Sequence, residues 1–525
     1  MTRRRKIAAA AAVALLAVAA GVAGLLWRVG HAPLSLGPAQ ALLHRAVDRV
    51  APGLAFQAAT ATVHWQRLRG RVVVTLGDLV FSGGPLASPV AVRRLRLSLQ
   101  AGALARARLR IAGIEADGLS ARIDWCLRDC PPHPRWDYAY QRARWFGAVQ
   151  RAWDNDVLAG LSAMRVRDSR IAWRETGSGA RHDMYVRIIE LKQARDALAV
   201  QGEGSVVRVG GAGGGGTVRL NGQLARGGQV RAVAEARLPA LADLLHGLPL
   251  DGWDTGLAMP VTVQATLHIG EAAATDLLAV DLAAGPGTVA HAAVYPEPRA
   301  FDAVGAQARF YPAEPALMHD KLEAAFGGAR LAIAGKIVFG SGAPAVALDG
   351  TMTALSVAAL KHYWPQTVGS GGREWVSANI DAGGLPEIRI AFHAAAADWT
   401  ADALPKTALT LDFDLADVTA HYRRPMPPLE AASGTGHMTL DDLRLDIRAG
   451  TVNGMALGPS SIVIAPFAAP PSYGDIDFAL AGPVPRLLDI ADSEPLGYVT
   501  SYGLAPGDTQ GMVEARATLR LPLLK

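Results

Sequence analysis

Two pairs of aspartates have the spacing that acid–base chemistry would need. Asp412 and Asp414, and likewise Asp475 and Asp477, lie two residues apart, so on a strand both carboxylates of a pair share one face. Such a pair could act as general acid and general base. Apolar residues alternate with the aspartates, however, and this pattern favours a solvated outer strand face over an active site.

Other signatures of catalysis or cofactor binding are missing or out of context. His437 near Asp441 and Asp442 is the closest approach to a metal-ligand cluster, and a solvated strand edge explains it better. Residues 211–216 have the glycine spacing of a dinucleotide loop, but a strand-like segment follows where a helix should begin. The sequence contains no Gly-x-Ser-x-Gly, no His-Glu-x-x-His and no Walker loop. We therefore expect no catalytic residue, metal site or cofactor. An enzyme whose site is assembled from residues far apart in the sequence remains the alternative.

The elements around these residues are predicted to be one-sided strands. In 95–100 every second residue is a leucine and the others are polar, which sends the leucines to one face. The same alternation recurs in 106–111, 121–125, 411–415, 475–478 and 515–521. Turn signals such as Asn221-Gly222 and Gly227-Gly228 separate the strands, as in antiparallel meanders.

The apolar strand faces need something to cover them, and their residues are the candidates for contact with an apolar ligand. These candidates are Leu95, Leu97, Leu99, Leu109, Ile111, Leu411, Phe413, Leu415, Ile476 and Phe478.

Helical patterns interrupt the strands. The clearest is an amphipathic helix over 135–165, in which Trp145, Val149, Trp153, Val157 and Leu161 recur every four residues. Short helices are predicted near 238–246, 356–365 and 484–491. Their spacing of about 120 to 130 residues suggests repeated supersecondary units.

The amino terminus predicts a membrane anchor. Four basic residues, 3–6, precede an apolar run over 7–27, which is long enough to span a bilayer once. A signal peptide cleaved after about residue 19 or 20 is the alternative, but the apolar run continues past that point. By the positive-inside rule Met1 stays in the cytoplasm and the rest of the chain lies outside. A short helix within 38–51 either lies beside the membrane or caps the first sheet.

Composition limits the classes of function. The 525 residues are 50% hydrophobic and 19% charged, which excludes a disordered chain. The net charge of +5 comes without a basic block after residue 6, so nucleic-acid binding is not expected. In an oxidising compartment Cys126 and Cys130 favour a small disulfide, with two free thiols as the alternative.

One stretch resembles a known family. This sequence motif consists of Tyr363-Trp364-Pro365, then Trp375 and Asn379 in Trp-Val-x-x-Asn-Ile, and then Gly383-Gly384. It resembles YhdP-type proteins of the AsmA-like superfamily. The resemblance implies an inner-membrane helix that carries a long β-sheet curled into an apolar groove, along which phospholipid moves between the inner and outer membranes.

The expected protein is therefore mainly β with interspersed helices: a transmembrane helix followed by an elongated, curled antiparallel sheet groove of repeated units. We expect a single-pass bacterial inner-membrane protein with its bulk in the periplasm, phospholipid as its partner, and outer-membrane or envelope proteins as further partners. The alternatives are a scaffold for outer-membrane protein assembly and an envelope hydrolase. The expected parts are 1–6 (tail), 7–27 (anchor), 28–60 (juxtamembrane helix and linker), 61–134 (first β region), 135–165 (helix), 166–355 (β repeats), 356–384 (family motif) and 385–525 (further β groove).

Overall fold

The structure, a computed structural model, divides the chain into two compact units. Unit 1 comprises residues 1–239, 243–250 and 264–277, and unit 2 comprises 240–242, 251–263 and 278–525. The residues described are 34–35, 53–66, 69–83, 88–106, 108–125, 138–175, 181–208, 215–245, 256–339, 343–400, 404–467, 472–503 and 505–523. Each unit is built mostly of strands, with a few short helices.

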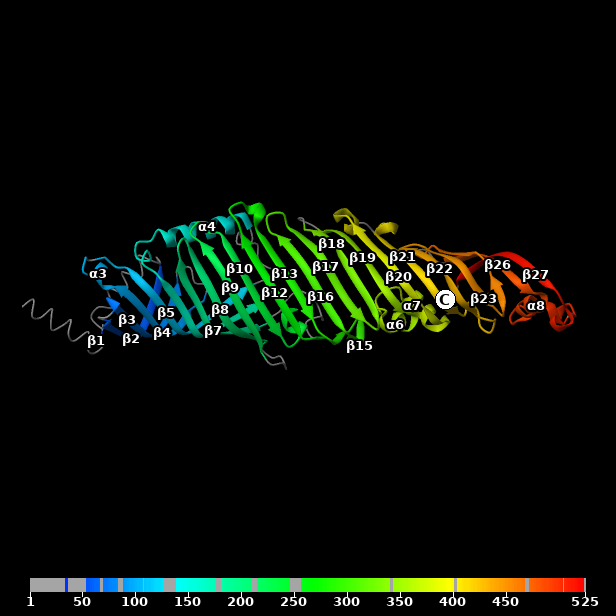
Figure 1. The fold of residues 1–525 in the computed structure, drawn as a ribbon, viewed down its shortest axis with the longest axis horizontal. Helices are drawn as coiled ribbons and strands as arrows, with labels where there is room; N and C mark the ends of the chain where they lie inside the picture. The colour runs from blue at the N-terminus through cyan, green and yellow to red at the C-terminus, as the bar shows by residue number, and fades with distance from the viewer. Residues whose placement is uncertain are drawn as a thin grey trace, which may run out of the picture. The chain divides into compact units, whose positions relative to one another are not determined.

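In unit 1 ten strands pair side by side in chain order, from β1 to β10 (Figure 1). The elements are β1 (Leu34–Ser35), β2 (Leu54–Gln66), β3 (Arg71–Gly83), β4 (Val90–Gln100), α3 (Ala101–Leu104), β5 (Ile111–Trp125), α4 (Tyr138–Trp153), β6 (Ala163–Glu175), β7 (Arg181–Ala194), β8 (Ala197–Arg208), β9 (Gly216–Ala225) and β10 (Val230–Leu238). The residues of α5 (Leu241–Leu245) and β12 (Val261–Ile269) are divided between the two units, and η4 (Ala273–Thr275) belongs to unit 1.

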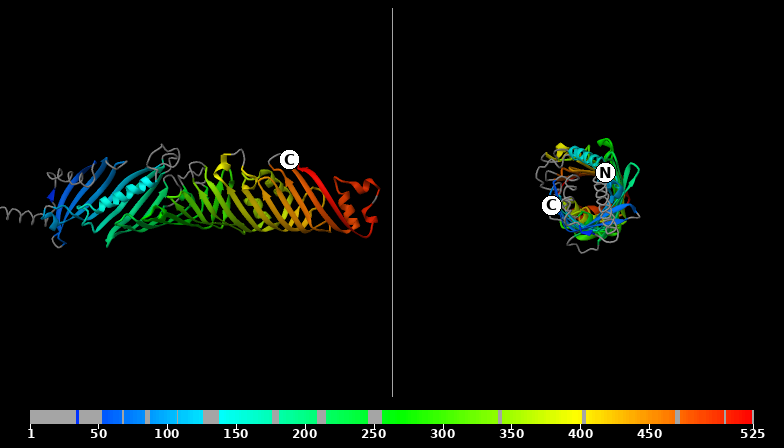
Figure 2. Two further views of the ribbon diagram at one scale, coloured as in Figure 1. Left: turned by 90° about the horizontal axis from the view of Figure 1, so that it is seen from above. Right: turned by 90° about the vertical axis from the view of Figure 1, so that its left-hand side faces the viewer.

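One pair of strands departs from the antiparallel pattern. β5 and β6 run parallel, with Gly113 beside Ala163 and Trp125 beside Glu175. A parallel pair requires a crossover connection, and α4 with the turns after it lies in that connection. The helix is the cyan one in Figure 2.

Unit 2 also has a long antiparallel sheet. Its strands pair in the order β13 (Leu277–Ala284), β16 (Ala303–Tyr311), β17 (Ala316–Phe326), β18 (Ala329–Val338), β19 (Ala345–Ser356), β20 (Ile380–Ala394), β21 (Leu409–Ala420), β22 (Leu429–Thr439) and β23 (Leu443–Val452). β24 (Met455–Leu457) and β25 (Ser460–Ala465) both bridge β23 to β26 (Ser472–Pro483), which pairs with β27 (Met512–Leu523).

The remaining elements of unit 2 are short. A small sheet contains β11 (Leu257–Ala258), β14 (Gly287–His291) and β15 (Tyr295–Phe301). The helices are α6 (Val357–Tyr363), α7 (Ser370–Asn379), α8 (Val484–Asp492) and α9 (Tyr498–Ser501), with 3₁₀ turns η5 (Ala396–Thr400), η6 (Lys406–Ala408) and η7 (Pro506–Asp508).

A row of backbone kinks crosses neighbouring strands of unit 1. Asp78, Gly118 and Asp168 on β3, β5 and β6 have positive φ and are left unpaired in the ladders. The residues across from them on the neighbouring strands are unpaired as well. Each kink moves the next side chain by one position, so Leu76 and Leu79 lie three residues apart yet belong to one core. Because the kinks are aligned, the apolar faces of these strands stay on the same side.

Unit 2 has kinks of the same kind. Ala354, Asp417 and Ala431 on β19, β21 and β22 have positive φ. The apolar residues beside them are again three apart, as with Leu415 and Val418 in one buried cluster. Asp tolerates this left-handed conformation better than most residues, whereas at an alanine it carries strain.

Part of the apolar face of unit 1 is a closed core. Val157, Leu158 and Leu161, which follow α4, pack on buried residues of β2 to β5. The Ile111 N–H donates to the Val157 carbonyl (2.8 Å), which fixes this segment to the start of β5.

Three local predictions were wrong. Residues 106 and 108–110 are not strand: the Arg106 and Arg108 amides donate to the Ala103 carbonyl, because α3 ends there in a tight turn. The helix predicted over 135–165 ends at Trp153 in the structure, turns follow, and β6 begins at Ala163. Asn221-Gly222 lies inside β9, where Gly222 faces Ala232 so closely that a Cβ atom would crowd it, whereas Gly227-Gly228 does turn the chain.

Some predictions fall on residues outside the described ranges. These are the anchor at 7–27, the helix within 38–51 and the Cys126–Cys130 disulfide. Among the helices that are described, none is both long and apolar enough to cross a bilayer.

Candidate functional site

The most extended feature of unit 2 is an apolar row that runs across its sheet. It consists of residues that are directly paired from strand to strand, and paired residues share a face. The apolar row is Ala284, Val304, Ala324, Leu331, Met352, Ile388, Phe413, Gly436, Leu445, Ile462, Ile476 and Leu519, on strands β13 to β27. Period-two alternation within each strand and the register between strands together make it continuous.

The apolar row is only partly covered. Ile388 is 8% exposed beneath α6, whereas Leu519 on β27 is 42% exposed. Most of the other members, Leu445 and Ile462 among them, are half-buried. Gly436 leaves room for the Phe413 ring, which would overlap any Cβ atom there. The row can therefore bury one side of an apolar ligand without first opening a closed core.

The predicted candidates divide into two groups. Phe413 and Ile476 belong to the apolar row, and Leu411 and Leu415 share the face of Phe413 by alternation. Phe478 packs against the same buried cluster as Leu487 and Ile490 of α8.

The candidates in unit 1 are brought together, but in the covered core. Leu99 and Ile111 are 8% and 9% exposed, and Leu95, Leu97 and Leu109 pack against the same cluster. The segment around Val157 packs against the same cluster. The row residues Met352 and Leu445 were not singled out, although Leu445 lies in an alternating segment.

Charged pairs occupy the opposite face of the unit 2 sheet. Arg309 Nε lies 2.6 Å from Asp320 Oδ2, His437 Nδ1 lies 2.7 Å from Asp412 Oδ1, and Arg520 Nε lies 3.5 Å from Asp475 Oδ1. The hydrogen bond from Arg309 holds the pKa of Asp320 below its usual value despite an opposing effect of burial. His437 thus pairs with Asp412 on the neighbouring strand, and Asp441 and Asp442 are not its partners.

A cavity of about 590 Å³ lies on this charged face, with Asp320, Arg389 and Asp412 among its lining residues. Asp320 and Arg389 each have an opposite charge nearby, Arg309 and Glu387, and Asp412 has the His437 imidazole as its partner. Among the described residues, no three His, Cys, Asp or Glu side chains gather closely enough to hold a metal ion.

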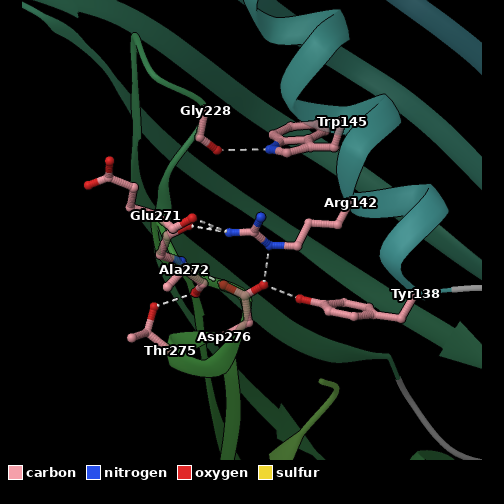
Figure 3. A network of polar contacts seen from close by, with 9 residues as sticks. Tyr138, Arg142, Trp145, Gly228, Glu271, Ala272, Thr275 and Asp276 are labelled. Atoms are coloured by element: carbon pink, nitrogen blue, oxygen red, sulfur yellow. Dashed lines mark hydrogen bonds and ion pairs between the residues drawn. The ribbon is translucent and has the colours of Figure 1, made fainter. Parts of the chain in front are cut away.

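Unit 1 contains a polar network that tethers α4 (Figure 3). The Asp276 side chain is 1% exposed, accepts from Arg142 Nε (2.7 Å) and the Gly270 N–H (2.7 Å), and accepts a short hydrogen bond from Tyr138. Arg142 also donates to the carbonyls of Gly270 and Glu271. One turn further, Trp145 Nε1 donates to the Gly228 carbonyl (2.9 Å). α4 is therefore bound both to the β9–β10 turn and to the turn that follows β12.

The network shifts two pKa values. Burial and the hydrogen bond to Asp276 raise the pKa of Tyr138 to about 12. Burial opposes ionisation of Asp276, but the hydrogen bonds from Tyr138, Arg142 and Gly270 outweigh it and hold its pKa below the usual value. Sequence patterns could not reveal this network, because Tyr138 and Asp276 lie 138 residues apart.

The motif residues build the helical part of unit 2. The Tyr363 ring packs on Phe301 and Phe326, and its hydroxyl donates to the Ala300 carbonyl (2.6 Å). Burial raises the pKa of Tyr363. Gly327, with φ of +54°, leaves space for this ring, since a Cβ atom would lie 2.8 Å from it.

The rest of the motif shapes the turns around α7. Trp364 Nε1 donates to the Val368 carbonyl (2.9 Å), and the Pro365 carbonyl accepts from the Val368 N–H. Asn379 donates to the Trp375 carbonyl and accepts from the His421 N–H (2.7 Å). Trp375 itself is 49% exposed. These contacts join α6 and α7 to the sheet and point to a structural role for the motif.

Comparison with known proteins agrees with the motif. A family model described as YhdP protein matches residues 278–525, which contain the apolar row and both helices of the motif. No curated protein and no solved structure matches the chain. The match over residues 278–525 supports a YhdP-type protein, and the AsmA-like superfamily is consistent with it.

Proposed function

We propose that the chain is an inner-membrane-anchored periplasmic protein that carries phospholipid between the inner and outer membranes and so maintains the outer-membrane barrier, without catalysis. The observation that carries the proposal is the continuous, half-open apolar row across twelve strands. Acyl chains lying along it would replace water at these side chains. Each methylene buried in this way gains about 0.8 kcal/mol.

The YhdP match supports the proposal, because it covers the part that carries the row. The anchor predicted at 7–27 would hold the protein at the membrane that supplies lipid. Retention of the anchor is tested by sequencing the amino terminus of the membrane-extracted protein, where cleavage near residue 19 or 20 would contradict it.

The test of the row uses two neighbouring residues of β25. Ile462 lies in the apolar row and pairs with Leu445 and Ile476, whereas Val463 faces Arg444 and Asp475 on the other side. Both are β-branched and half-buried. Ile462→Glu places a charge where acyl chains would lie, and Val463→Glu places the same charge on the polar face.

The full chain is expressed in bacteria, purified, and its bound lipid is extracted and quantified by mass spectrometry. We expect phospholipid in the wild type and in V463E, and at least about tenfold less in I462E, because a buried carboxylate without a partner costs several kcal/mol. Wild-type protein that is repeatedly empty would refute lipid carriage. Photocrosslinking from Leu445 separates the alternatives: lipid adducts support transport, and adducts with outer-membrane proteins support an assembly scaffold.

A further inference from the structure

Electric charge is divided very unevenly along the chain. Residues 1–250 contain 35 Lys and Arg against 17 Asp and Glu, whereas residues 251–525 contain 17 against 30. The first part thus has a net charge of +18 and the second a net charge of −13. With this asymmetry the basic part would attract anions.

Within unit 1 the positive charge concentrates on the polar face of β5, β6 and β7. Arg122, Arg170, Arg174 and Arg181 surround a cavity of about 240 Å³, with Ala172 and Asp183 also among its lining residues. Ala172 is directly paired with Arg122 on β5 and with Asp183 on β7, and its small side chain leaves the space between the guanidinium groups open.

Among the side chains that the structure describes, acidic residues neutralise only half of this cluster. Arg170 Nη2 lies 2.6 Å from Asp183 Oδ2, and Arg174 Nε lies 3.2 Å from Asp124 Oδ1. The Asp183 side chain is only 9% exposed, so it is committed to Arg170. Among the residues that the structure describes, Arg122 and Arg181 have no carboxylate partner, and the cluster keeps a charge of +2.

The register makes this excess charge unfavourable unless an anion is present. Arg174 and Arg181 are directly paired across β6 and β7, and like charges at directly opposed positions destabilise a sheet. The planar guanidinium group matches the oxygen atoms of a phosphate in a bidentate way. A phosphate group at Ala172 would therefore meet four guanidinium groups and relieve the repulsion.

We infer that Arg122, Arg170, Arg174 and Arg181 form a binding site for a phosphate group, either the headgroup of an anionic phospholipid or free phosphate. The site lies on the face of the unit 1 sheet opposite its apolar core, so it does not rest on the apolar row of unit 2. Arg170 and Arg174 are held in place by their aspartates, and Arg122 and Arg181 supply the unneutralised charge.

Two ligands without acyl chains test the site independently of lipid carriage. They are inorganic phosphate and glycerophosphoglycerol, the headgroup of phosphatidylglycerol, titrated calorimetrically into the full chain at low ionic strength. Tighter binding of glycerophosphoglycerol assigns the site to a lipid headgroup, and tighter binding of phosphate assigns it to free phosphate. Binding of neither overturns the inference.

A charge-matched pair of variants locates the binding. Arg122→Gln with Arg181→Gln removes two positive charges at the cavity, and Arg219→Gln with Arg231→Gln removes two exposed charges from β9 and β10 of the same unit. We expect the first pair to weaken binding at least about tenfold and the second less than twofold. Equal weakening by both pairs would show general electrostatic attraction and overturn the site. The unfolding temperature of each variant shows that it is folded.

Discussion

The tether of α4 gives a sharp prediction, because one buried carboxylate holds three donors. Asp276→Asn keeps the shape of the side chain but removes its charge and turns one acceptor into a donor that faces Arg142. Breaking a buried ion pair costs about 3–5 kcal/mol. Arg142 keeps its two carbonyl acceptors and is 18% exposed. We therefore expect a loss of stability at the lower end of this range, about 3 kcal/mol.

The effect is local, since α4 can detach while the strands of unit 1 stay paired. A change of about 3 kcal/mol corresponds to roughly a hundredfold larger opening equilibrium. Hydrogen exchange of the α4 amides, followed by mass spectrometry on the full chain, measures it. Thr275→Ala is the control, because Thr275 lies in the same turn and only donates to the exposed Ala272 carbonyl. If exchange in α4 changes less than twofold in D276N, the tether does not hold the helix.

Two further predictions concern the effect of low pH on the α4 tether and the packing of Tyr363 in the family motif. Because the folded-state pKa of Asp276 is lowered from an unfolded value of about 3.9, its stabilisation is full above about pH 5 and is lost as the pH falls through the folded-state pKa. In the wild type, the protection of the α4 amides from hydrogen exchange should therefore fall at low pH. A wild type whose protection depended on pH in the same way as that of D276N would contradict this. Gly327→Ala should lower the free energy of opening of α6, measured by hydrogen exchange, by about 1–3 kcal/mol more than Gly328→Ala does. Both glycines have positive φ, but only at Gly327 does a Cβ atom meet Tyr363, so equal effects would refute the packing role of that ring.

Local patterns in the sequence predicted much of the fold. Alternation identified β4, β21 and β26, because one face of each is apolar and the other charged. Apolar spacing indicated α6 and α8, at Val357–Tyr363 and Val484–Asp492. These elements depend on neighbours within a few residues, which the sequence shows directly.

Features that depend on distant residues could not be predicted in this way. The parallel pairing of β5 with β6 requires the crossover through α4, and the tether of α4 joins Tyr138 to Asp276. The arginine cluster likewise forms only when β5, β6 and β7 are in register. Its signal in the sequence is the excess of basic residues before residue 250, which the near balance of total charge conceals.

The kinks explain why alternation predicted short segments of strand and missed their continuity. Along β21, Leu411, Phe413 and Leu415 alternate, and a strict period of two would next place Asp417 on the apolar face. The structure instead gives Asp417 a φ of +52°, and Val418 takes the apolar position, 8% exposed. A one-residue slip would bury charge along the whole strand. The kink prevents this in β21, and Ala431 in the paired strand β22 makes the same correction beside Ala432, which pairs with Val418. Where the apolar period shifts by one residue within a strand, a continuous apolar face therefore requires a matching kink in the adjacent strand, placed in register with the first.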